Sequence, residues 1–443
     1  MPALVCLLSL LVFINPFSVL ADHAPSLEGV GFASPPALRV RVLKKVHAFQ
    51  ISGEGIRVLD GRLPEGNGKE SSAPFWSVVC DAGKILVKSK GYLESSSKKE
   101  SVQGQLSDRG MNSTQVSFEK KGGVLHLGKN TYRDVLRVRL VDPHSCDVMN
   151  EVDLEKYLDG LVNSEFSSKW HEESIAAQVI AARTYAYHQL LDARAVRKSQ
   201  FFDLDSTTTD QVYEGARKES SRASRIAERT RGLILATYQP QKERWEPVKA
   251  FYHSACGGLT ELPERVWKKK FAGFKKQVSC DFCKESPVYQ WSLNLSAEEI
   301  TRAVLQNASE RERKFLKLQL LQKMVQPALV SIELDPGLEK SRVLRVKLTW
   351  KTDSQVFTAS VSGARFRDWI GNTRLKSTWF AAHLISSHAG SGGRHSQWRL
   401  DGFGHGHGVG MCQWGAKRMG ERGFTYASIL QYYYPAAMLK KIW

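Results

Sequence analysis

An α+β fold is predicted, with a small N-terminal antiparallel β domain at residues 22–150 and a mixed α+β region at residues 151–443. Residues 22–150 alternate short β-rich runs with Gly, Ser and Lys turns, which is typical of an antiparallel sheet. After residue 150, helix-like and strand-like patterns occur in turn. The 443 residues are 42% apolar and 24% charged, an ordinary composition for a globular protein of two or three domains.

Residues 1–21 are expected to be a signal peptide. They contain no charged side chain and end in Val19-Leu20-Ala21, a sequence suited to cleavage after Ala21. We therefore expect an exported protein of the periplasm or cell envelope. An uncleaved membrane anchor is the alternative, because no Lys or Arg precedes the apolar stretch.

The expected β domain contains seven runs with the composition of strands: ALRVRVLKKV, FQISG, IRVLDG, FWSVV, KILVKS, GVLHLG and VLRVRLVD. Cys80 and Cys146 fall in or near this region. In an exported protein these two cysteines are able to pair, although connectivity cannot be deduced from sequence.

The stretch Val152–Leu191 is expected to hold a short amphipathic turn, a glutamate at Glu165 and a long buried helix. The helix is predicted to begin near His171, because two glutamates follow in its first turn, where negative charge is favourable. Arg183 lies among alanines on this helix. A buried guanidinium needs a carboxylate or carbonyl partner, and Glu165 is the candidate just upstream.

Further helices and strands are predicted along residues 151–443. Four helices are expected: one over SSRASRIAERTRG, one from the capping box Ser296-x-x-Glu299 to about Leu305, one from about Ser309 to Met324, and a final one ended by Pro435. The expected strands are LILATY and a meander of VSIELD, VLRVKLTWK and FTASVSG. The helical and meander part is expected to be an insertion at about residues 296–365.

Two short-spaced ligand pairs predict a metal site. His253-x-x-Cys256 and Cys280-x-x-Cys283 have the spacing of a tetrahedral Cys3His zinc site. We expect this zinc to be structural, since four protein ligands leave no position for a catalytic water, which disfavours a zinc-dependent amidase. A Cys280–Cys283 disulfide is the alternative.

A glycine-rich segment, Gly402 to Gly410, has the sequence GFGHGHGVG. Alternating glycines allow the backbone to approach a ligand or a neighbouring strand closely. A metal site formed by His405 and His407 is an alternative use of the segment. Cys412 is expected to be a buried free thiol, and Trp414 either stacks on a sugar or fills the core.

The formal net charge of +18 indicates either a polyanionic partner or simply a basic, solvated secreted protein. Export makes nucleic acid a poor choice. Peptidoglycan glycan strands fit better, because a strand stripped of its stem peptides carries a lactyl carboxylate on every disaccharide.

Four segments resemble, in the same order, the family of the sporulation stage II D protein and the related amidase-enhancer proteins. They are VDLEKYLDGLVNSEF, AAQVIAARTYA, FYHSACGG and GFGHGHGVGMCQWGAKRMGERGFTYASILQYYYP. The resemblance covers roughly residues 130–440. It implies a peptidoglycan lytic transglycosylase, or a protein that assists the amidases acting on the same strands.

The resemblance assigns the general acid/base role to Glu165. One carboxylate suffices if the C6 hydroxyl of MurNAc is the nucleophile, since no water is then used. Leu161, Val162 and Phe166 would raise the pKa of this glutamate, whereas a nearby Arg183 would lower it. The expected substrate-binding residues are Arg183, Thr260, Lys276, His407 and Gln413. For Arg183, an internal ion pair that holds the fold is the alternative.

We therefore expect cleavage of the MurNAc–GlcNAc bond in peptide-stripped strands, giving 1,6-anhydroMurNAc ends. The alternative is a non-catalytic glycan-binding activator of an N-acetylmuramyl-L-alanine amidase.

Overall fold

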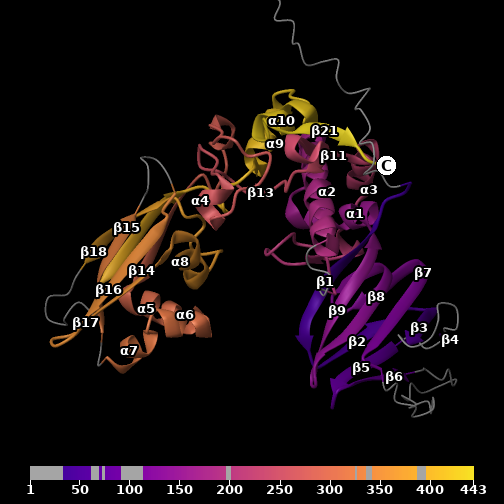
Figure 1. The fold of residues 1–443 in the computed structure, drawn as a ribbon, viewed down its shortest axis with the longest axis horizontal. Coiled ribbons are helices and arrows are strands. Elements are labelled where there is room, and N and C mark those ends of the chain that lie inside the picture. The colour runs from indigo at the N-terminus through magenta and orange to yellow at the C-terminus, as the bar shows by residue number, and fades with distance from the viewer. Residues whose placement is uncertain are drawn as a thin grey trace, which may run out of the picture.

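A computed structural model describes residues 33–60, 69–71, 75–90, 113–195, 201–324, 327–335, 342–386 and 396–443. The expected signal peptide lies outside these residues. The expected α+β class is confirmed. The chain has the outline of an arch, with an N-terminal sheet and a second β-rich module as its two sides (Figure 1). Helices α2 (Glu172–Ala195), α9 (Gln413–Glu421) and α10 (Tyr426–Tyr433) lie between them.

The N-terminal sheet has the strand order β10-β1-β9-β8-β7-β2-β5-β6, with β3 and β4 beside β7. Its pairs are antiparallel, except that β1 and β10 are parallel. The strands are β1 (Ala37–Val46), β2 (Ala48–Ser52), β3 (Ile56–Asp60), β4 (Lys69–Ser71), β5 (Phe75–Asp81), β6 (Lys84–Lys90), β7 (Gln115–Leu127), β8 (Asn130–Asp142), β9 (Ser145–Asp153) and β10 (Leu204–Asp205).

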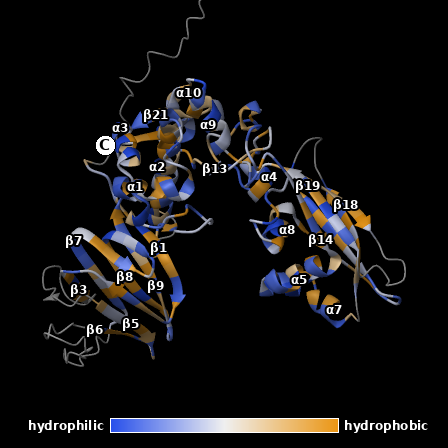
Figure 2. Ribbon diagram, turned by 180° about the vertical axis from the view of Figure 1, so that it is seen from behind, coloured by the Kyte–Doolittle hydropathy of each residue, from blue (hydrophilic) through white to orange (hydrophobic). Residues whose placement is uncertain are grey.

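All seven runs expected to be strands fall in this sheet. Hydrophobic and hydrophilic residues alternate along the strands (Figure 2), so that one face of the sheet supplies the core. Cys80 in β5 and Cys146 in β9 form a disulfide, the pairing that the sequence left open.

The sheet leads directly into helix α1 (Leu154–Glu165). Asp153 caps this helix by accepting hydrogen bonds from the backbone N–H groups of Glu155 and Lys156. Helix α2 follows and is buried on nearly every side, because its Ala, Ile and Val residues contact several elements at once. Helix α3 (Ser221–Arg229) and a three-stranded sheet of β12 (Arg244–Pro247), β11 (Leu233–Gln239) and β21 (Met438–Lys441) lie beside it. The turn η1 (Ala216–Lys218) contacts α1, and η2 (Pro240–Lys242) connects β11 to β12.

Strands β13 (Tyr252–His253) and β20 (Met411–Cys412) form a parallel pair that joins distant parts of the chain. Helix α4 (Pro263–Trp267) and the turn η3 (Asp281–Cys283) lie between them in sequence. The glycine-rich segment packs flat against residues 251–257. A Cβ atom on Gly406 would lie 2.9 Å from the Cβ of His253, which explains why this position has no side chain.

The second β-rich module has its own hydrophobic core, with Trp350, Phe366 and Trp369 fully buried. Its elements are β14 (Gln290–Ser296), α5 (Ala297–Asn307), α6 (Glu310–Phe315), α7 (Leu318–Lys323), β15 (Ala328–Asp335), β16 (Arg345–Lys351), β17 (Val356–Ser362), α8 (Gly363–Ile370), β18 (Phe380–Ser386) and β19 (Gln397–Phe403). The capping box at Ser296 and the meander β15-β16-β17 are present as expected.

Two expectations for this module need correction. Its core extends from Trp291 to Leu400, because β14 pairs with β19, so it is larger than the expected insertion at about 296–365. The helix expected from about Ser309 to Met324 is two helices, broken where Lys317 has a positive φ of 55°. Among the described residues, the structure contains no helix with the length and hydropathy needed to span a membrane.

Candidate active site and cysteine cluster

Glu165 is the last residue of α1, and its carboxylate is largely enclosed. It accepts hydrogen bonds from the backbone N–H of Val212, at 2.5 Å, and from the Tyr252 side chain. Burial outweighs these two bonds and raises the pKa of Glu165 to about 7. The negative end of the α1 dipole acts in the same direction. A carboxyl group with this pKa is able to donate and accept a proton near neutral pH.

A buried glutamine orients the tyrosine that contacts Glu165. Tyr157 Oη donates to Gln211 Oε1, and Gln211 Nε2 donates to Tyr252 Oη, both at 2.9 Å. Because the Tyr252 oxygen already accepts this bond, its hydroxyl proton is available for the Glu165 carboxylate. Gln211 thereby fixes the direction in which Tyr252 donates.

Next to Glu165 lies a pocket of about 300 Å³, which we call the central pocket. Tyr252 joins the two, because it lines the pocket and also bonds to Glu165. Trp267 of α4 is 39% exposed, and its ring lies 4.5 Å from Phe251 and 5.0 Å from His407. The lining residues are Tyr185, Thr208, Thr209, Asp210, Phe251, Tyr252, Val266, Trp267, Ala364, Arg367, Asp368, Asn372, Thr378 and His407.

Asp210 brings a second carboxylate to the central pocket. Its Oδ1 accepts hydrogen bonds from Tyr185 Oη at 2.8 Å and Gln189 Nε2 at 2.7 Å, and its Oδ2 accepts from the backbone N–H of Asp205 at 2.9 Å. Three donors therefore hold this carboxylate in place. These hydrogen bonds fix the segment that carries Val212, whose backbone N–H donates to Glu165.

His407 lines the central pocket as a neutral side chain. Its Nδ1 accepts a hydrogen bond from the backbone N–H of Val409 at 3.0 Å. Burial lowers the pKa of His407 well below its ordinary value, although a bond to the Tyr252 backbone opposes this shift. Burial also lowers the pKa of the neighbouring His405 to about 4. The contacts with the backbone of Val409 and Tyr252 make the His407 ring a fixed part of the pocket wall.

A row of aromatic rings continues from the other side of Glu165. Ring centroids of Phe166 and Trp170 lie 5.2 Å apart, and those of Trp170 and Trp414 lie 5.4 Å apart. The three side chains are only partly buried. Trp414, for which the sequence left two roles open, therefore packs on another aromatic residue while retaining some exposed surface.

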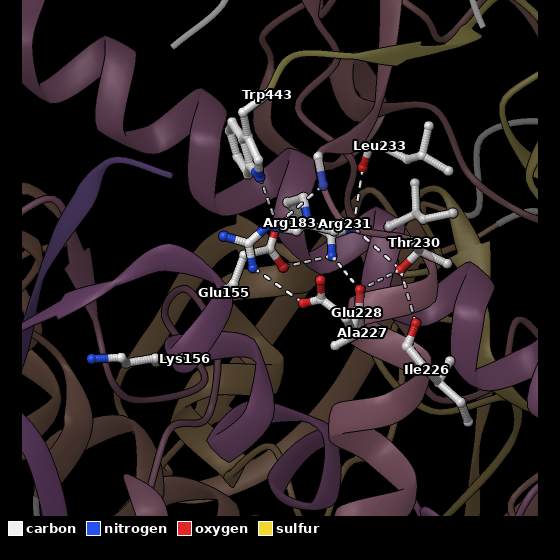
Figure 3. Close-up of polar contacts among 12 residues, drawn as sticks. Glu155, Lys156, Arg183, Ile226, Ala227, Glu228, Thr230, Arg231, Leu233 and Trp443 are labelled. Carbon is white, nitrogen blue, oxygen red and sulfur yellow. Dashed lines mark hydrogen bonds and ion pairs between the residues drawn. The ribbon is translucent and has the colours of Figure 1, made fainter. Parts of the chain in front are cut away.

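Arg183 does not face the candidate site, which corrects its expected role in binding substrate. It is fully buried and forms a two-pronged ion pair with Glu155, in which Nε and Nη2 lie 2.9 and 2.7 Å from the carboxylate oxygens (Figure 3). Its remaining bonds go to the carbonyl oxygens of Leu233 and Ala227 and to Thr230. Arg183 therefore joins α1, α2, α3 and β11.

Glu155 and Glu165 stand at opposite ends of α1. Ten residues of helix separate them by about 15 Å, at about 1.5 Å per residue. Arg183 consequently does not contribute to the pKa of Glu165, and the expected partnership between these two residues is wrong. The Glu155 carboxylate also accepts from Trp443 Nε1 at 3.0 Å, which fixes the C-terminus against the start of α1.

Three other expected substrate-binding residues lie outside the central pocket. Thr260 is buried, and its hydroxyl accepts a hydrogen bond from the backbone N–H of Val278 at 2.7 Å. Lys276 is exposed, and Gln413 is buried at the start of α9. Neither is among the residues that line the pocket. The polar contacts of Thr260 are those of a residue that stabilises a turn.

Four buried cysteines come together beneath the glycine-rich segment. The Sγ atoms of Cys256, Cys280, Cys283 and Cys412 all lie within 4.8 Å of one another, and none forms a disulfide. In a tetrahedral zinc site with Zn–S bonds of about 2.3 Å, the sulfurs are about 3.8 Å apart. The Cys412 sulfur also accepts hydrogen bonds from the backbone N–H groups of Cys256 and Gly415, both at 3.3 Å. The set fits a closed four-thiolate site.

Cys412, and not His253, is the fourth member of this set. His253 Nδ1 lies 3.1 Å from the carbonyl oxygen of Val409, and its ring lies 5.7 Å from that of His407. Burial lowers the pKa of His253 to about 3, so the ring is neutral. The pairing of β13 with β20 brings Cys412 to Cys256 across a long separation in sequence.

Comparison with known proteins places the candidate acid within a recognised domain. Residues 142–238 match the model of the stage II sporulation protein family. The chain contains a stage II sporulation protein domain. It is 28% identical to the amidase enhancer of Bacillus subtilis over 64% of this chain and 40% of that protein. It is 26% identical to stage II sporulation protein D of the same organism over 66% of this chain and 76% of that protein.

An uncharacterized protein of Brachyspira hyodysenteriae is also similar, with 26% identity over 72% of this chain and 74% of that protein. The stage II sporulation protein domain contains Glu165, Asp210 and the Glu155–Arg183 pair. Trp267, His407 and the cysteine cluster lie beyond it. The central pocket therefore combines this domain with residues of α4, α8 and the glycine-rich segment.

Proposed function

We propose that the protein is an exported lytic transglycosylase that cleaves the MurNAc–GlcNAc bond of peptide-stripped glycan strands and leaves 1,6-anhydroMurNAc ends. The observation that carries this proposal is Glu165, a carboxyl group with a pKa of about 7 beside a pocket with an exposed tryptophan. Relatives named stage II sporulation protein D and amidase enhancer support the coarser part of the proposal, a role in the cell wall.

Glu165 acts twice in the proposed reaction. In its protonated form it donates a proton to the glycosidic oxygen as the bond to C1 of MurNAc breaks. The C6 hydroxyl of the same MurNAc attacks C1, and its proton passes to the Glu165 carboxylate, which restores the acid. The bonds to Val212 and Tyr252 keep the carboxyl group in one orientation through both steps.

The central pocket offers the surfaces that a sugar ring requires. The indole of Trp267 is partly exposed, and aromatic rings bind the apolar face of sugars. Asp210 is held by three donors, and its positioning role leaves Glu165 as the proton-transfer group. Substrate-assisted attack by C6 makes a second reacting carboxylate unnecessary.

The test of this proposal is the substitution Glu165→Gln. It removes proton transfer and preserves the shape of the side chain, so cleavage of stripped strands should fall by about 10²- to 10⁴-fold. Strand binding and the melting temperature at pH 5 should change little. Glu54→Gln, at an exposed glutamate of the N-terminal sheet, is the matched control and should cleave normally. Full activity of Glu165→Gln would remove this glutamate from the mechanism.

Activation of an amidase is the second candidate function, and the 28% identity to an amidase enhancer favours it. In this case the pocket binds the strand and the partner enzyme performs the chemistry. The same variant separates the two functions. A Glu165→Gln protein that still stimulates an N-acetylmuramyl-L-alanine amidase, in a preparation whose wild type cleaves no glycan, would establish the activator.

We propose further that the four-cysteine cluster binds one structural zinc ion. Zinc would be held by Cys256, Cys280, Cys283 and Cys412, and with four protein ligands its role is to stabilise the fold. The disulfide between Cys80 and Cys146 supports an oxidising compartment. Free thiols within 4.8 Å of one another would oxidise in such a compartment, and a bound metal would protect them.

Export itself belongs to the proposal. It rests on the composition of residues 1–21 and on the disulfide, which is typical of proteins outside the cytosol. An exported protein with a net charge of +18 meets the polyanionic strands directly.

A further inference from the structure

A second pocket adjoins the central pocket, and Trp267 belongs to both. We call it the basic pocket; its volume is about 250 Å³. Three cationic side chains and one carboxylate line it: Arg265, Lys268, Arg342 and Glu261. The residues common to both pockets are Val266, Trp267, Ala364 and Thr378. A ligand that extends past Trp267 therefore enters a region with two more positive than negative charges.

Arg342 is buried in this pocket, where the negative charges of Glu261 and of the cysteine cluster act on its guanidinium. It is 3% exposed, and its Nη1 and Nη2 donate to the carbonyl oxygens of Gly406 and Cys256, both at 3.1 Å. Within the described part of the chain, its Nε has no hydrogen-bond partner, and no carboxylate lies within ion-pair distance. The guanidinium therefore faces the glycine-rich segment, beside Gly408, and forms one wall of the basic pocket.

Arg265 also retains an unused donor. Its Nε lies 3.2 Å from Glu261 Oε1, which already accepts from the backbone N–H of Leu262 at 2.8 Å and from Gln277 Nε2 at 3.1 Å. The Nη2 atom of Arg265 is buried, and the described residues provide no partner for it. One carboxylate shared among these donors leaves Arg265 and Lys268 with more positive than negative charge.

We propose that the basic pocket binds the lactyl carboxylate of a MurNAc unit adjacent to the bond being cleaved. This inference rests on the proposed function and adds the means by which the site recognises stripped strands. The unused Nη2 of Arg265 supplies a charge-assisted hydrogen bond, and Lys268 adds a further positive charge. Trp267, between the two pockets, contacts the sugar ring.

The consequence is selectivity for strands without stem peptides. In intact peptidoglycan the same lactyl group is an uncharged amide, which leaves the cations unneutralised. Charge-assisted hydrogen bonds of this kind correspond to roughly a 10- to 100-fold difference in affinity. The position of the carboxylate also fixes the register of the strand, because it recurs once per disaccharide.

Two forms of one oligosaccharide test this inference. The first is a stripped strand of defined length, and the second is the same strand with its lactyl carboxylates converted to methylamides. Affinities are measured by calorimetry with the Glu165→Gln protein, so that neither form is cleaved. We expect the carboxylate form to bind roughly 10- to 100-fold more tightly.

Substitutions show which residue causes the preference for the carboxylate form. Arg265→Gln should reduce the ratio of the two affinities towards one, and Arg265→Lys should retain part of it. The matched control is Arg302→Gln, an exposed site on α5 with the same change of charge, which should keep the full ratio. Arg342 is left unchanged, because its Nη atoms hold the backbone of the glycine-rich segment.

Equal binding of both forms, or a ratio that Arg265→Gln does not change, would overturn the inference. Wild-type cleavage measured on both forms separates it from the proposed function. Equal cleavage of both forms would contradict the carboxylate site and leave the transglycosylase intact. Tighter binding of the carboxylate form, with no cleavage of either form, would support the carboxylate site and refute the transglycosylase activity.

Discussion

Replacing Glu165 by glutamine should stabilise the protein at alkaline pH and leave it nearly unchanged at acidic pH. The folded protein holds the pKa of Glu165 at about 7, compared with its ordinary value of 4.5. Between these two values the native state binds more protons than the unfolded state, so the contribution of this group to stability falls as pH rises. Below about pH 4.5 the group has no effect, and above about pH 7 its cost is complete.

The magnitude follows from the difference of about 2.5 pH units, which at about 1.36 kcal/mol per unit corresponds to at most about 3 kcal/mol. Glutamine never ionises, and its Oε1 is still able to accept from Val212. The variant should therefore exceed the wild type in stability by about 1–3 kcal/mol at pH 8, and the two should be similar near pH 4.5. Active-site groups that trade stability for function commonly behave in this way.

The assay is urea unfolding of the wild type and of Glu165→Gln at pH 4.5, 6 and 8, compared as differences at each pH. Glu54→Gln, at an exposed glutamate, is the control and should give the same small difference at all three values. A Glu165→Gln protein no more stable than the wild type at pH 8, or a difference independent of pH, would refute the reasoning. Glu165 would then be an ordinary ionised carboxylate, unable to donate a proton at neutral pH.

Three further predictions concern activity, metal and packing. Cleavage by the wild type should fall as pH rises above about 7, because Glu165 must be protonated to donate; a pH–rate profile that is flat to pH 9 would contradict this. Elemental analysis should find one zinc per chain. Cys412→Ser should lower the zinc content and the melting temperature more than it lowers the cleavage rate per folded molecule. A wild-type protein that contains no metal after purification without chelator would refute the zinc site. Arg183→Met should destabilise the fold by about 3–5 kcal/mol in urea unfolding, because Glu155 is left buried and unpaired, and Arg183→Met with Glu155→Leu should recover part of the loss; a single variant as stable as the wild type would contradict the structural role.

The sequence predicted well those elements whose pattern is local. Alternation along the N-terminal strands and the alanine-rich face of α2 depend on neighbouring residues alone. Strand β9 was missed because Asp147 and Asn150 interrupt its hydrophobic pattern; Asp147 pairs with Arg41 and Asn150 bonds to the β8 backbone. The break between α6 and α7 was missed because a lysine rarely adopts the positive φ of Lys317.

The partners of the site residues were harder to predict, since long-range contacts decide them. Arg183 was assigned to the nearer glutamate, but helix geometry brings Glu155 to it and holds Glu165 away. Cys412 follows Cys283 by 129 positions and reaches the cluster only through the β13–β20 pairing. Short-spaced motifs identified three of the four cysteines and added His253 in error.

Several residues of the site belong to none of the motifs from which the site was predicted. Asp210 and Gln211 stand together in the polar segment DQVYEG, which lies outside the four segments that carry the family resemblance. Trp267 sits in a short helix that carries no catalytic motif, and its importance follows only from its exposure between two pockets.

The central claim is tested most directly by the chemistry of the new glycan ends. Stripped strands are digested with the wild-type protein in water enriched in oxygen-18, and the products are analysed by mass spectrometry. The account predicts ends of 1,6-anhydroMurNAc without the label, because the C6 hydroxyl of the sugar is the nucleophile. Reducing MurNAc ends that carry one oxygen-18 atom would contradict it. Such products would make the protein a hydrolase, in which a second carboxylate such as Asp210 takes part in the reaction.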